Sequence, residues 1–70
     1  MKDNIMKIIQ SYEIANVSLT MEKVDYDYIY FVIVKRGGKD IVKIYYGDDQ
    51  SMAANQFNVL RTLVTELIRG

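Results

Sequence analysis

The stretch that most constrains the fold spans residues 26–46, which we interpret as a β-hairpin. Both of its arms are rich in β-branched and aromatic residues, which favour an extended backbone. Between the arms, Gly37 and Gly38 suit a two-residue turn because glycine adopts positive φ at no steric cost. The hairpin therefore sets the strand register and the two sheet faces that the rest of the chain must cover.

A turn at Gly37 and Gly38 predicts a definite cross-strand pairing. Arg36 is expected opposite Lys39, and Ile33 opposite Val42. One face of the hairpin is then the more uniformly apolar and is expected to take the main core: Ile29, Phe31, Ile33, Val42, Ile44 and Tyr46. The other face carries Tyr28, Tyr30, Val32, Val34, Ile41, Lys43 and Tyr45. A slip of one residue would exchange the faces of one strand relative to the other.

Three further elements flank the hairpin. Over residues 3–13, apolar side chains at helical spacing predict a short N-terminal helix. Residues 17–22 alternate apolar and polar, which predicts an edge strand with one wet face. An apolar stripe over residues 52–69 predicts a longer helix, with three candidate N-caps: Asp48, Asp49 and Ser51.

These elements predict one domain over residues 1–70 of the α+β class. The expected order is αβββα, a three-stranded antiparallel meander packed by an N-terminal helix and a longer C-terminal helix. Whether the first helix or another molecule covers the second sheet face stays open at this point.

The composition excludes several chemistries. The chain has no cysteine and no histidine, so disulfides, thiolate or imidazole zinc sites and histidine general bases are ruled out. No pair of the remaining acids stands in a recognisable catalytic arrangement, and we expect neither an enzyme nor a cofactor. No signal peptide or membrane span is recognisable, and the simplest location for a chain without cysteine is the cytoplasm.

Four carboxylates are expected at one end of the meander: Asp25, Asp27, Asp48 and Asp49. An Mg²⁺ or Ca²⁺ ion could bind oxygen ligands there. The alternative interpretation is that these acids cap helices and occupy solvated turns. Their spacing matches no EF-hand loop, so we predict no metal site.

The second hairpin face is the candidate binding surface. It gathers tyrosines and aliphatic residues in a patch of the kind that marks a binding site when it is exposed. The predicted partner-binding residues are Tyr28, Tyr30, Val32, Val34, Ile41 and Tyr45. The partner would be another protein or a second copy of the chain.

A basic hairpin tip offers an alternative function. The side chains of Lys35, Arg36, Lys39 and Lys43 could contact phosphates in a nucleic-acid-binding accessory protein. Nine basic and nine acidic residues give a net charge of zero, however, whereas proteins that bind nucleic acid usually carry a basic excess. Protein binding is therefore the preferred interpretation.

In element order and length, the chain resembles the small phage-encoded anti-CRISPR proteins that inhibit a CRISPR nuclease. Those inhibitors present carboxylates as DNA mimics, and here Asp40 and the acidic end would correspond, although Arg36 and Lys39 make the turn itself basic. The resemblance implies a small phage or prophage protein that binds a protein of its host.

Overall fold

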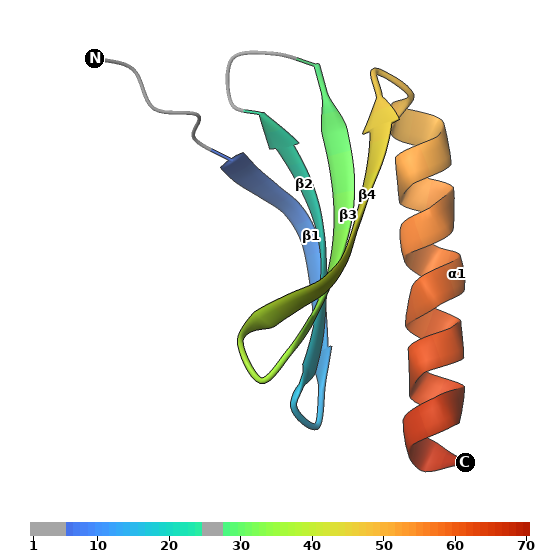
Figure 1. Ribbon diagram of the computed structural model, residues 1–70. Coiled ribbons are helices and arrows are strands. Elements are labelled where there is room, and N and C mark those ends of the chain that lie inside the picture. The colour runs from blue at the N-terminus through green and yellow to red at the C-terminus, as the bar shows by residue number, and fades with distance from the viewer. Residues whose placement is uncertain (1–5, 25–27) are drawn as a thin grey trace.

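The computed structural model describes residues 6–24 and 28–70, which form a four-stranded antiparallel sheet and one helix (Figure 1). The sheet is a meander in the order β1-β2-β3-β4, and α1 covers one of its faces. The elements in chain order are β1 (Met6–Ile14), β2 (Val17–Val24), β3 (Tyr30–Arg36), β4 (Lys39–Gly47) and α1 (Gln50–Arg69). The α+β class is confirmed, but the prediction of three strands with an N-terminal helix is wrong.

The predicted first helix is a strand over the residues that the structure describes. β1 pairs antiparallel with β2 from Met6 to Ile14, and its register shifts between Ile8 and Gln10. Ile9 is therefore an extra residue in a β-bulge, and the bulge moves the apolar positions out of strict alternation. An isolated helix of this length gains little in water, whereas β1 pairs with β2 on both sides of the bulge.

β2 confirms the strand predicted over residues 17–22 but corrects its place in the sheet. It lies between β1 and β3, so it is an inner strand and not an edge. The turn before it consists of Ala15 and Asn16, and Ala15 has a φ of 54°. The backbone N–H of Gly37 donates to the carbonyl of Asn16 at 2.9 Å, which ties the two hairpin tips together.

The glycine turn is confirmed, but the pairing beyond it is not the one predicted. Gly37 and Gly38 have φ values of 59° and 84°, and Arg36 pairs with Lys39. Lys35 then pairs with Asp40 and Val34 with Val42, so Ile41 is an extra residue in a second bulge. Consequently Ile33 lies opposite Lys43 rather than Val42.

This one-residue shift changes which hairpin residues share a face. Val42 and Ile44 lie opposite Val34 and Val32, on the side of the sheet that α1 covers. The set predicted for the main core is therefore split between the faces, because Phe31 and Ile33 lie on the other side.

The core forms where α1 packs on the two inner strands. Phe57 and Ala53 of the helix are at most 2% exposed. They contact four buried residues of β2 and β3: Leu19, Met21, Tyr30 and Val32. Tyr46 packs against this cluster, and its burial raises the pKa of its phenol above the ordinary value.

The C-terminal helix is confirmed, with Asp49 as its N-cap among the three candidates. The backbone N–H of Met52 donates to Asp49 Oδ1 at 2.9 Å, which satisfies one of the N–H groups that lack a partner within the helix. In the described part of the chain, no helix has the length and apolar character needed to cross a membrane.

Replacing Asp49 with alanine should lower the free energy of unfolding by about 1 kcal/mol, because the cap hydrogen bond is lost. The matched control is Asp48→Ala, which removes a carboxylate one residue earlier, where no cap is formed. Urea unfolding followed by circular dichroism measures both variants. Equal losses in the two variants would show that the effect is only one of charge near the helix end.

Candidate protein-binding surface

One face of the sheet is not covered by any element that the structure describes. Successive residues of a strand point to opposite sides, so the residues that alternate with the core side chains all lie on this second face. We call this surface the open sheet face, and its principal residues are Ile8, Thr20, Glu22, Phe31, Ile33, Lys35, Lys43 and Tyr45.

The register arranges these residues in rows that run across the strands. One row joins all four strands and ends in two aromatic rings: Ile8, Glu22, Phe31 and Tyr45. The next row is mixed: Ser11, Thr20, Ile33 and Lys43. The row nearest the hairpin tips is polar: Glu13, Ser18, Lys35 and Asp40. The open sheet face thus changes from largely apolar at one end to charged at the other.

The centre of this face is buried although no helix lies on it. Ile33 is 4% exposed, and Thr20 and Glu22 are 8% exposed. The sheet is strongly twisted, and the tip of the β3–β4 hairpin turns away from α1 toward this side (Figure 1). The centre of this face is therefore nearly buried without any described element packed over it.

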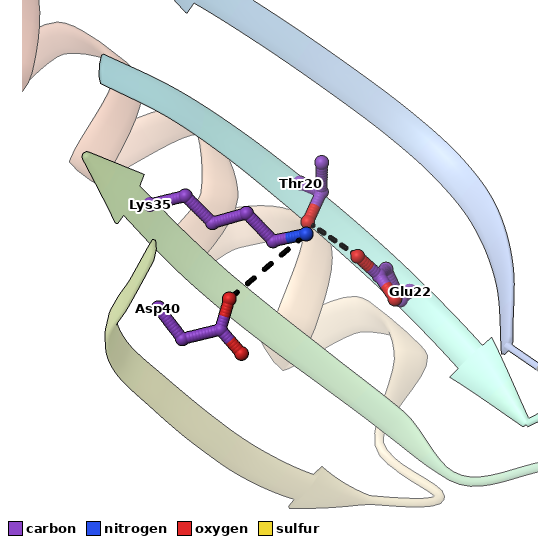
Figure 2. A network of polar contacts seen from close by, with 4 residues as sticks. All are labelled: Thr20, Glu22, Lys35 and Asp40. Carbon is purple, nitrogen blue, oxygen red and sulfur yellow. Dashed lines mark hydrogen bonds and ion pairs between the residues drawn. The ribbon is translucent and has the colours of Figure 1, made fainter. Parts of the chain in front are cut away.

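The polar contacts of this face come from three strands. Figure 2 shows them from the side opposite α1, with the helix behind the sheet. The hydroxyl of Thr20 donates to Glu22 Oε2 at 2.7 Å, within β2. Lys35 Nζ lies 3.9 Å from Asp40 Oδ1, across the β3–β4 pair. Because both of these side chains are more than one third exposed, this ion pair contributes little to stability.

The aromatic end of the face is organised around Phe31. Its ring centroid lies 5.5 Å from that of Tyr45, and the two rings are tilted by 53°. Lys43 Nζ lies 4.8 Å from the Phe31 centroid in a cation–π contact. Tyr45 is 63% exposed and Ile8 is 57% exposed, so the aromatic row is open to solvent at both ends.

The six predicted partner-binding residues do not form one surface. Tyr30 and Val32 belong to the core, and Val34 packs against it beneath α1. Ile41 is exposed at the bulge of β4, and Tyr45 lies on the open sheet face. Tyr28 is exposed before β3, and Lys23 Nζ lies 5.0 Å from the centroid of its ring.

The four predicted nucleic-acid contacts are divided between the two sides of the sheet. Lys35 and Lys43 lie on the open sheet face, in contact with Asp40 and Phe31 as described above. Arg36 and Lys39 pair with each other beside the glycine turn and are exposed on the opposite side. The four cations therefore do not form a single basic patch.

The predicted acidic end is only partly described. Asp25 and Asp27 lie outside the described residues, and Asp49 serves as the helix cap. Within residues 6–24 and 28–70, no group of three or more acidic side chains is placed to hold a metal ion.

Sequence reasoning missed the residue at the centre of the site, Glu22. The alternation over residues 17–22 correctly put Ser18, Thr20 and Glu22 on the side opposite Leu19, but it indicated a wet face. Only the register with β3 sets Phe31 opposite Glu22 and Ile33 opposite Thr20. Thr20 and Glu22, at the centre of this face, are then only 8% exposed. No signal in the sequence of β2 alone would have found it.

No protein-family model, curated protein or solved structure matches this chain. The observed order of elements in the described residues, ββββα, differs from the order αβββα on which the resemblance to anti-CRISPR proteins was based. That resemblance stays an untested hypothesis.

Replacing Thr20 with valine should destabilise the chain by about 1–3 kcal/mol, because the shape is kept while the buried carboxylate of Glu22 loses a donor. Ser18→Ala, on the same strand and the same face, is the matched control and should cost less than half as much. Chemical denaturation of both variants provides the comparison. If Thr20→Val and Ser18→Ala lowered the free energy of unfolding equally, the hydrogen bond from Thr20 to Glu22 would not contribute to stability.

Proposed function

We propose that the chain is a small, non-catalytic protein-binding domain that holds its partner on the open sheet face. The observation that carries this proposal is the row of Ile8, Glu22, Phe31 and Tyr45, which is apolar and aromatic around a central carboxylate. Aromatic residues are enriched at protein interfaces because they bury a large ring, and tyrosine also keeps its hydroxyl hydrogen-bonded at a wet rim.

The central carboxylate indicates the chemistry of the partner. The Thr20 hydroxyl satisfies one oxygen of Glu22, and the Glu22 residue is only 8% exposed. A purely apolar partner would bury this group further without a donor, at a cost of about 1–3 kcal/mol or more for a charged group. A partner that places a lysine, an arginine or another hydrogen-bond donor over Glu22 would avoid that cost.

The surrounding charges define how such a partner would lie. Lys43 and Lys35 stand on the β3 and β4 side of the face, whereas Ile8 lies across Glu22 on β1. A basic group of the partner would therefore approach Glu22 from the β1 side, away from the two lysines. Its apolar neighbours would contact the Phe31 and Tyr45 rings.

Site-specific photo-crosslinking in the native host tests this proposal. A benzophenone side chain at position 45 lies on the open sheet face, and one at position 58 lies on the exposed, polar side of α1 as the matched control. We expect a protein adduct from position 45 that is absent from position 58 and is lost in the Ile8→Glu variant. Adducts that a nuclease destroys would favour nucleic-acid binding, and identical adducts from both positions would overturn the proposal.

With the cross-linked partner purified, Glu22→Gln should weaken binding by at least about thirty-fold, since removing one member of a buried, charged hydrogen-bonded pair costs about 2–5 kcal/mol. Glu13→Gln is the control, because Glu13 is an exposed glutamate at the far end of the same face. Isothermal titration calorimetry measures both. If Glu22→Gln bound the partner as tightly as wild type does, Glu22 would not be part of the binding site.

A further inference from the structure

A polar groove lies between the C-terminal half of α1 and β1. Figure 1 shows this half of the helix running beside the tip of the β1–β2 hairpin. The groove has a volume of about 350 Å³, at the lower end of the range for small-molecule sites. It lies on the side of the sheet that α1 covers, so it is separate from the open sheet face. Its lining residues are Tyr12, Arg61, Thr62, Thr65, Glu66 and Arg69.

Tyr12 joins the two walls of the groove. It pairs with Leu19 of β2, so its ring lies on the side of the sheet that α1 covers. The Tyr12 hydroxyl lies 2.6 Å from Thr65 Oγ1, and the Arg61 guanidinium lies 5.2 Å from the centroid of the Tyr12 ring. This cation–π contact uses one face of the guanidinium and leaves the N–H groups along its edge for a ligand.

The hydroxyl groups of the groove already use their protons. Thr62 Oγ1 donates to the carbonyl of Asn58 at 3.1 Å, and Thr65 Oγ1 donates to the carbonyl of Arg61 at 2.8 Å. Because a hydroxyl has one proton, the Tyr12 hydroxyl is the donor in its contact with Thr65 Oγ1. The Tyr12 oxygen can then only accept a hydrogen bond from a ligand. The donors left for a ligand are therefore the two arginine guanidiniums.

The charged side chains of the groove are not paired with one another. Arg61, Glu66 and Arg69 are exposed, and none of them forms an ion pair with another residue in the described part of the chain. Glu66 and Arg69 stand in the last turn of α1, where carbonyl groups without a partner within the helix add partial negative charge. The groove is thus most positive at Arg61, and its negative groups gather toward the end of the helix.

We propose that this groove binds a free α-amino acid. The carboxylate of the ligand would accept two parallel hydrogen bonds from Arg61, whose planar guanidinium matches it, with Arg69 as a further donor. The ammonium group would donate to Glu66 and to the Tyr12 oxygen, which are the side-chain acceptors of the groove. A ligand with a carboxylate alone would leave both acceptors unused. A phosphate dianion would place excess negative charge beside Glu66 and the helix end.

Titration of the isotope-labelled full chain with glycine, followed by NMR at constant ionic strength, tests this proposal. Glycine carries the two groups that all α-amino acids share, and acetate is the matched probe that lacks the ammonium group. We expect saturable shifts of the Thr62, Thr65 and Arg69 amide signals with glycine. Acetate should bind at least about tenfold more weakly, because it makes no charge-assisted hydrogen bond to Glu66. No saturable shift with glycine, equal binding of acetate, or tighter binding of inorganic phosphate would overturn the proposal.

Three variants assign the two ends of the ligand. Arg61→Gln, at an exposed position, should weaken glycine binding by at least about tenfold. Lys39→Gln removes the same charge from an exposed residue beside the glycine turn and should leave glycine binding unchanged. Glu66→Gln should weaken glycine binding and strengthen the binding of inorganic phosphate, because the carboxylate attracts the ammonium group and repels the dianion. Equal weakening by Arg61→Gln and Lys39→Gln, or a Glu66→Gln variant that binds both probes as wild type does, would contradict the proposed site.

Discussion

The contact of Phe57 and Ala53 with the inner strands is the interaction on which the rest of the structure depends. The small side chain of Ala53 permits a close approach of helix and sheet, and Phe57 is the largest fully buried side chain in the cluster that also contains Leu19 and Val32. This contact lies on one side of the sheet only. On the opposite side, which no described element covers, the nearly buried Glu22 lies beside the aromatic pair of Phe31 and Tyr45.

The hairpin shows how far sequence reasoning could go. Gly37 and Gly38 identified the turn, because two adjacent positive-φ positions leave few alternatives. The bulge at Ile41 left no comparable signal, since Ile41, Val42 and Ile44 are all apolar and the sequence does not show which of them faces the core. A single extra residue then moved Val42 and Ile44 to the helix side, so the composition of both faces was beyond prediction.

The prediction for the N-terminal segment, a helix where the structure has β1, was wrong for a related reason. Apolar residues at positions 5, 8, 9 and 12 fit a helical period. In the observed strand the extra residue Ile9 shifts the register, so that Ile8 and Tyr12 lie on opposite sides of the sheet and show no strand alternation in the sequence. Pairing with β2 decides whether this segment is a helix or a strand, and that pairing leaves no signal in the local sequence. Of the predicted binding residues, Tyr45 lies on the open sheet face, whereas the β3 residues Tyr30 and Val32 became core because the face of β3 was assigned the wrong way round.

The position of α1 behind the sheet has a consequence for binding at the open sheet face. Along β2 and β3, Glu22 and Phe31 alternate with Met21 and Val32, which belong to the core cluster packed by α1. A partner that moved either strand on the open side would therefore also disturb the helix contact on the other side.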